Sequence, residues 1–197
     1  MTYFVFIQSI SFSEYAAGSV LCDWIANHFD TSDIALLPYA VKSFTEMGNA
    51  IKLLANRMTN NDRLIICIDA HANESTIYFK DKNSLDKMQT VGDAAWIYFD
   101  VILDSLYKKF GNNALVIFIS CRSACHFSTL KSPHIPIIAA EGEINAMRAN
   151  KHLVVLYEQL CKNKTIEQAY DAMIQEFPLE DEIKIEGNHK AVLKLFK

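Results

Sequence analysis

The sequence predicts a three-layer α/β domain, in which a mostly parallel sheet of about six strands is covered by helices on both faces. Short apolar blocks of strand length alternate along the chain with longer segments of helical period. This alternation is typical of parallel strands joined by crossover helices. Several blocks are continuously apolar, as expected for strands covered on both faces. With 197 residues, 51% of them hydrophobic, the chain fits one domain spanning residues 1–197.

The beginning of the chain predicts two strands with a helix between them. Residues 3–7 are continuously apolar and indicate a buried strand. Residues 13–29 follow as a helix, with Ser13 as its N-cap. Residues 34–37 indicate a second strand, and we expect Pro38 to end it. The expected apolar face of the helix comprises Tyr15, Val20, Leu21, Trp24, Ile25 and Phe29.

The next segment predicts a helix, a covered strand and a short extended piece. Residues 44–58 have a helical period, and the polar residues 60–62 make the turn after it. Residues 64–68 have the continuous apolarity of a strand that is covered on both faces. Residues 76–79 form a short extended piece with residues 80–83 as its loop.

The following segment predicts a long helix and two further strands. Residues 94–110 form a strong helix, which the glycine and asparagines at 111–113 end. Residues 114–119 are uniformly apolar and indicate another covered strand. Residues 135–139 indicate the next strand.

Two helices and an ambiguous tail complete the chain. The helices are expected at residues 146–161 and 166–176, with Thr165 as the cap of the second. The tail from residue 183 to residue 196 is ambiguous and is a candidate edge strand.

Composition and charge exclude several classes of protein. A net charge of −4 with scattered signs leaves no basic stripe for nucleic acid. No uncharged apolar run approaches the ~18 residues of a membrane span, and residues 1–7 lack the basic leader of a signal peptide. The five cysteines are an odd number without zinc-ribbon pairing. Reduced thiols in a cytoplasmic protein explain this best.

Chemically capable residues follow two of the predicted strands. Asp69-Ala70-His71-Ala72-Asn73 follows one, and Ser120-Cys121-Arg122-Ser123-Ala124 follows the other. If the two strands are neighbours, their ends lie ~5 Å apart, so an imidazole could meet a sulfur. A cysteine attacks as the thiolate, and a nearby histidine lowers a thiol pKa from ~8.5 to ~3.5–7.5. The residues therefore predict a site for acyl transfer.

These two stretches resemble the caspase-like cysteine peptidases. In that family the histidine precedes the cysteine by ≈ 50 residues, and the cysteine lies in a Gln-Ala-Cys-[Arg/Gln/Gly]-Gly stretch. Here His71 precedes Cys121 by 50 positions, and Ser-Cys-Arg-Ser-Ala is a variant of the stretch. The pattern is closer to the bacterial CHAT group and more distantly similar to metacaspases and separases. The strand and helices from residue 135 to about 177 are also similar to CHAT domains.

The resemblance implies a caspase-like fold and a cysteine endopeptidase. It implies that Cys121 is the nucleophile, that His71 is the general base and acid, and that the amides of Ala72 and Cys121 stabilise the oxyanion. No metal or organic cofactor is required. The substrate would be a protein or peptide, and a bare domain would need an activating partner, processing or oligomerisation. A role in bacterial signalling or defence follows from the CHAT resemblance alone.

The chain departs from the family pattern at two positions. The family usually has glycine directly after the histidine, where this chain has Ala72, and alanine disfavours a positive φ. Relatives that cleave after basic residues have aspartate two positions before the cysteine, where this chain has Ile119. The candidate substrate-binding residues are Asp69, Asn73, Arg122, Glu141 and Glu143.

Other functions are weighed beside proteolysis. A catalytically silent scaffold could bind a peptide or protein partner on the same surface, and Ala72 favours it. Cys125 and His126 invite a metal site with Cys121 and His71, but Cys-x-x-x-Cys-His is not a usual zinc spacing. Cys125 could also form a disulfide with Cys121 under oxidation. A flavodoxin-like nucleotide or receiver domain lacks its Gly-rich phosphate loop at residues 8–12.

Overall fold

The fold is described from a computed structural model of the chain. The described residues are 1–9, 17–72, 77–80, 88–90, 93–121, 123, 135–140, 142–143, 146–176 and 193–196. Ser13 and Tyr15, the predicted cap and first apolar residue of the first helix, lie outside these ranges.

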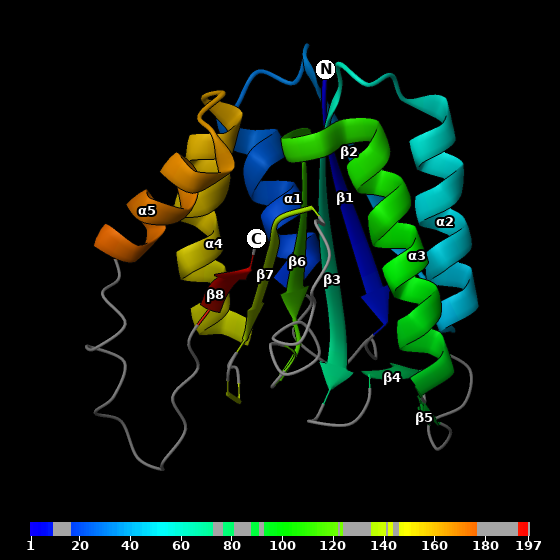
Figure 1. The fold of residues 1–197 in the computed structure, drawn as a ribbon. Coiled ribbons are helices and arrows are strands. Elements are labelled where there is room, and N and C mark those ends of the chain that lie inside the picture. Colours follow the sequence, from blue (N-terminus) through cyan, green and yellow to red (C-terminus); the bar gives the residue numbers. More distant parts are fainter. Residues whose placement is uncertain are drawn as a thin grey trace.

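A six-stranded path forms the centre of the fold, in the order β2-β1-β3-β6-β7-β8 (Figure 1). Its strands are β1 (Thr2–Ser9), β2 (Ile34–Ala40), β3 (Arg63–Ala72), β6 (Ala114–Ile119), β7 (Ile137–Ala140) and β8 (Leu193–Phe196). The neighbours from β2 to β7 pair in parallel, and β8 pairs antiparallel with β7. The mostly parallel sheet is confirmed, and so is an edge strand in the tail.

A small antiparallel hairpin extends the sheet at the end of β3. Its strands are β4 (Ile77–Lys80) and β5 (Met88–Thr90), and β4 pairs with the last residues of β3. The sequence predicts an extended piece at residues 76–79 with residue 80 in a loop, whereas Lys80 is in β4 and pairs with Met88. The sequence pattern does not indicate β5, whose three residues are too few to show a period.

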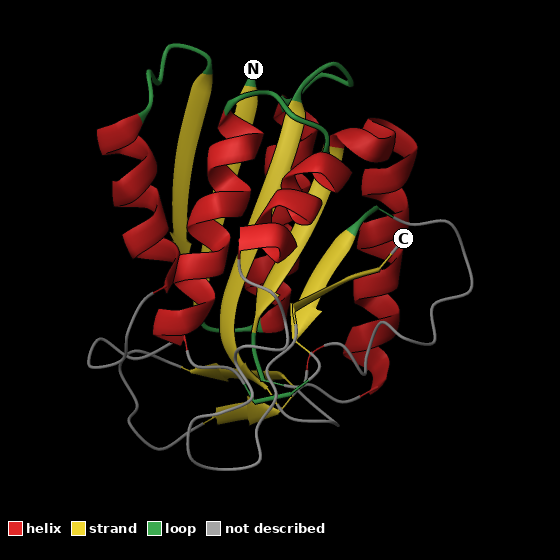
Figure 2. Ribbon diagram, turned by 90° about the vertical axis from the view of Figure 1, so that its left-hand side faces the viewer, coloured by secondary structure: helices red, strands yellow, loops and turns green. Residues whose placement is uncertain are grey.

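Helices cover both faces of the sheet, which confirms the three layers (Figure 2). They are α1 (Ala17–His28), α2 (Phe44–Arg57), α3 (Asp93–Phe110), α4 (Ala146–Cys161) and α5 (Ile166–Glu176), with a 3-10 turn at Gly111–Asn113. α2 and α3 pack on one face, and α1, α4 and α5 pack on the other (Figure 1). None of the helices within the described ranges is long and apolar enough to cross a membrane.

Each face of the sheet has its own hydrophobic core, because successive strand residues point to opposite sides. In β6, Val116 and Phe118 belong to the core under α2 and α3, and Leu115 and Ile117 belong to the core under α1 and α4. All six residues of β6 are buried. The prediction of a strand covered on both faces is therefore confirmed.

Two predictions about the first elements are wrong. Pro38 does not end β2, because it pairs in register with Phe6 and the strand continues to Ala40. β2 is an edge strand, where a missing N–H can face outward without breaking the ladder. Val20 was expected on the apolar face of α1, but it is 42% exposed, while Leu21 and Ile25 are fully buried.

Local side-chain caps define two of the helix starts. The Ser43 hydroxyl accepts a hydrogen bond from the Glu46 backbone N–H at 3.1 Å, at the N-terminus of α2. The predicted cap Thr165 accepts from the Gln168 N–H, and Gln168 Oε1 accepts from the Thr165 N–H, both at 3.2 Å. This reciprocal pair is a capping box, which satisfies two otherwise unpaired backbone donors.

Burial predicts a large difference between two leucine-to-alanine substitutions in helices. Leu156 in α4 is fully buried, and Leu53 in α2 is 53% exposed. We expect Leu156→Ala to lower the free energy of unfolding by ~2–5 kcal/mol, because it leaves a cavity in the core under α4. Leu53→Ala should change it by less than ~0.5 kcal/mol. Urea unfolding followed by circular dichroism measures both, and equal midpoints would contradict the burial assignment.

Candidate active site

The structure brings the two predicted strand ends together. β3 and β6 are neighbours in the parallel sheet, and their last pair is Asp69 with Ile119. His71 and Cys121 each lie two residues beyond that pair. The sequence predicts that the first of these strands ends at residue 68, but β3 continues to Ala72 and contains His71. Since paired strands lie ~4.8 Å apart, His71 near the end of β3 and Cys121 just beyond β6 both lie at the carboxyl edge of the sheet. Ligand sites in open parallel α/β sheets gather at this edge.

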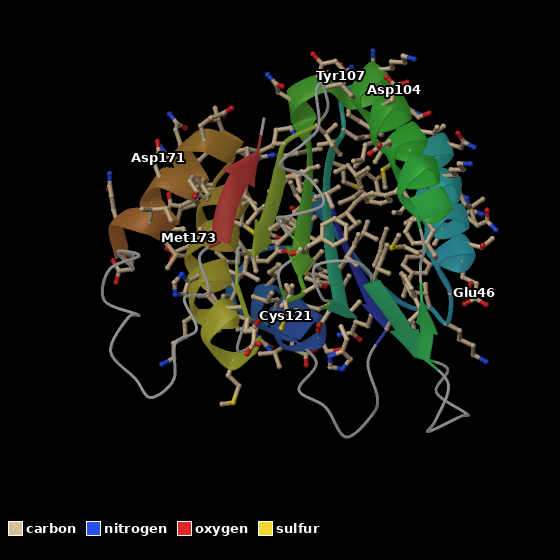
Figure 3. The ribbon with its side chains drawn as sticks, turned by 60° about the horizontal axis from the view of Figure 1, so that its bottom comes forward. Glu46, Asp104, Tyr107, Cys121, Asp171 and Met173 are labelled. Carbon is tan, nitrogen blue, oxygen red and sulfur yellow. The ribbon has the colours of Figure 1, made fainter. Side chains whose placement is uncertain are left out.

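Strand alternation places Asp69 and His71 on the face covered by α1 and α4. Cys67 of β3 and Ile119 of β6 belong to the core of that face, and alternate residues of a strand share a face. The charge of Asp69 contributes to raising the pKa of the Cys67 thiol, after the larger effect of burial. Figure 3 shows Cys121 at the carboxyl edge of the sheet, where α1 and α4 begin.

Pairing with β4 holds the end of β3 in an extended conformation. His71 pairs with Tyr78, and Ala72 pairs with Ile77. Among the described non-glycine residues, only Asn163 has a positive φ, of 58°. The backbone at Ala72 is therefore compatible with an alanine, and the missing glycine imposes no strain there.

Burial differs between Cys121 and the polar residues near it in the sheet and the turn. Cys121 and His71 are half-buried, so a substrate can reach them. By contrast, Asp69 is 4% exposed, and Ser120 and Ser123 are also buried. Cys121 is therefore more accessible than these three polar residues of its turn and of β3.

Of the remaining predicted site residues, one is exposed and the others lie outside the described residues. Glu143 is exposed and lies between β7 and α4. Asn73, Arg122 and Glu141 lie outside the described residues. Cys125 and His126 also lie outside them, so the metal site and the disulfide stay predictions.

Two polar residues at this edge were missed by sequence analysis. Gln8 follows the apolar run of β1 and pairs directly with Asp69 of β3. Its Oε1 accepts a hydrogen bond from Ser19 Oγ at 3.1 Å, and its buried Nε2 has no partner among the described residues. The position of Gln8 directly after the apolar run of β1 was the sequence signal that could have identified it. The other residue is Ser123. It lies within the stretch at residues 120–124, but its side chain contacts β7, and the stretch itself does not indicate that contact.

A separate cavity lies at the opposite edge of the sheet. Its volume is about 830 Å³, and its lining includes Arg63, Cys161 and Glu167. The Arg63 guanidinium donates hydrogen bonds to the carbonyls of Leu160 at 3.1 Å and Lys164 at 2.5 Å, where α4 ends. Arg63 therefore stabilises the end of a helix, and the cavity has no contact with the Cys121 turn.

Comparison with known proteins identifies the fold. No protein-family model matches the chain, and no curated protein matches it in sequence. Among solved structures, it is similar to caspase-1 from Spodoptera frugiperda, with a TM-score of 0.60, 16% identity, and coverage of 99% of this chain and 85% of that chain. It is also similar to pro-sf-caspase-1, with a TM-score of 0.54, 13% identity, and coverage of 100% and 86%. The chain therefore has a caspase-like fold.

Proposed function

We propose that the protein is a cysteine endopeptidase, with Cys121 as its nucleophile and His71 as its general base and acid. The observation that supports this most is the pairing of β3 with β6 in register, which gives both residues the same offset beyond the last pair. The caspase-like fold supports a protein or peptide substrate. No metal or organic cofactor enters the proposed chemistry.

The proposed reaction is an acyl transfer in two stages. The Cys121 Sγ attacks the carbonyl carbon of the scissile bond, and His71 takes up the thiol proton and delivers it to the leaving amine. The backbone amides of Ala72 and Cys121 would hold the negative charge that develops on the carbonyl oxygen. Departure of the amine leaves the acyl group on Sγ as a thioester. Water, deprotonated by His71, then attacks the acyl carbon, the carbon–sulfur bond breaks, and His71 returns the proton to Sγ as the second product leaves.

Residues around the thiol are proposed to contact the substrate. Asp69, Asn73, Arg122, Glu141 and Glu143 are the candidates, and the place of Asp69 in the last pair of β3 and β6 supports it. The similarity of the motif to the CHAT group leads us to propose one specific protein partner, in bacterial signalling or defence, with an activating partner or an oligomer. Cleavage of a randomised peptide library, with Cys121→Ala as the blank, tests this substrate class.

Thiol labelling provides the first test, because the other described cysteines should not react at neutral pH. Burial raises the pKa of the Cys67 thiol and raises that of Cys161 to about 12. Burial and the charge of Asp23 raise the pKa of Cys22. A raised pKa keeps a thiol protonated, so its alkylation should become appreciable only as the pH rises into the alkaline range.

We expect iodoacetamide at pH 7 to add one label, at Cys121, about tenfold faster than it labels free cysteine. The protein should carry Cys125→Ser, since Cys125 lies outside the described residues. Peptide mapping by mass spectrometry locates the label, and Cys121→Ala in the same background should take up none. Slow labelling of Cys121, or faster labelling of Cys22, would argue against the enzyme.

A binding scaffold is the second candidate function, and the alanine at position 72 favours it. In that case Cys121 would be inert to iodoacetamide, and the Cys121→Ala protein would bind its partner as tightly as the wild type. Labelling therefore separates the two functions before any substrate is known.

A further inference from the structure

Ser123 makes two hydrogen bonds that connect the Cys121 turn to the neighbouring strand. The side chain is fully buried. Its Oγ donates to the Ser120 carbonyl at 2.9 Å and accepts from the backbone N–H of Ala140 at 3.1 Å. The backbone N–H of Ser123 also donates to the Ser120 carbonyl at 3.4 Å. One hydroxyl therefore serves both the turn after β6 and the end of β7.

The hydrogen bonds between Ser123 and Ser120 close a turn that contains Cys121. Ser120 and Ser123 are the ends of the turn, and Cys121 directly follows Ser120. The parallel register of β6 and β7 ends at Phe118 with Ala139, so the Ala140 N–H is the next group along the strand. It donates to the Ser123 hydroxyl. The hydroxyl thus continues the connection between β6 and β7 past the end of their ladder.

We propose that Ser123 is a positioning residue that holds the Cys121 thiol in place through this turn, a role that rests on the proposed function of Cys121. Ser123 is buried and does not contact substrate. A hydroxyl both donates and accepts, and alanine can do neither. In Ser123→Ala the Ala140 N–H and the Ser120 carbonyl both lose this buried partner, so the hydrogen bond between the turn and β7 is removed.

The test compares alkylation of Cys121 in the wild type, Ser123→Ala and Ser123→Thr, each in the Cys125→Ser background. We expect Ser123→Ala to slow alkylation at pH 7 and to lower kcat on a cleaved peptide roughly tenfold to hundredfold, with KM unchanged. Ser123→Thr keeps the hydroxyl and should restore most of the rate. Amide exchange at Ala140 should accelerate in Ser123→Ala.

Ser9→Ala is the matched control, since Ser9 is another buried serine at the carboxyl edge, on β1. It should leave alkylation of Cys121 unchanged, even where it lowers the melting temperature as much as Ser123→Ala does. All rates are measured well below the melting temperature of each variant. An alkylation rate in Ser123→Ala equal to that of the wild type would overturn the positioning role.

The same experiment separates this role from the proposed function. The absolute alkylation rate of wild-type Cys121 tests the enzyme, because an activated thiol reacts faster than free cysteine. The ratio of the Ser123→Ala rate to the wild-type rate tests the positioning role. An inert wild-type thiol with an unchanged ratio would overturn both. A fast thiol with an unchanged ratio would overturn the positioning role alone.

Discussion

Cys121→Ala is expected to abolish peptide cleavage, with kcat/KM falling on the order of 10⁴-fold or more. Alanine has no nucleophilic atom, so the thioester cannot form and only unassisted attack by water remains. Cys121 is half-buried in a turn, so the substitution removes little packing and should leave the fold intact. Initial rates on a peptide selected from the randomised library measure the effect.

Cys22→Ala is the matched control for this loss. Cys22 is another half-buried cysteine, and it lies on α1, packed against the hydrophobic core on that face of the sheet. Its substitution should leave kcat and KM within about twofold of the wild type. If Cys121→Ala cleaved the peptide at the wild-type rate, the proposed mechanism would be wrong.

His71→Ala is expected to lower kcat by ~10²–10⁴-fold, the usual contribution of a general acid and base. The thiol remains, but no imidazole accepts its proton or protonates the leaving amine. The pH dependence of kcat should change as well, since the remaining activity should rise with the concentration of hydroxide. Added imidazole in the buffer should recover part of the rate, because the half-buried position is accessible from solvent.

His28→Ala serves as the control, because His28 is an exposed histidine at the end of α1. Its ring stacks on Trp24 with the ring centroids 5.0 Å apart, and its Nδ1 lies 2.8 Å from the Trp24 carbonyl oxygen. This substitution should leave both kcat and its pH profile unchanged. A His71→Ala protein with the wild-type pH profile would remove His71 from the mechanism.

Most of the fold was predictable because its elements are long and strongly patterned. The strand at 114–119 was predicted with the bounds of β6, and the helices at 146–161 and 166–176 with those of α4 and α5. In each segment, the spacing of apolar residues matches the period of the element that buries them. β5 was missed because three residues carry no such period.

The candidate site was predictable as residues, but its arrangement required the tertiary structure. His71 and Cys121 are visible in the sequence as reactive side chains after apolar runs. The offset of each residue beyond Asp69 and Ile119 depends on the register of β3 with β6, which no local pattern specifies. The contact of Ser123 with Ala140 spans 17 residues and depends on β7 being the next strand.

The sequence by itself determined which segments are strands and helices, because the spacing of apolar side chains in each segment matches the period of the element that buries them. It also determined that a thiol and an imidazole come shortly after two uniformly apolar runs. Only the tertiary structure decided that these strands are neighbours, that Pro38 lies within an edge strand, and that Ser123 connects the turn to β7. These features are contacts between residues far apart in the chain, and they form only when the whole sheet packs against its helices.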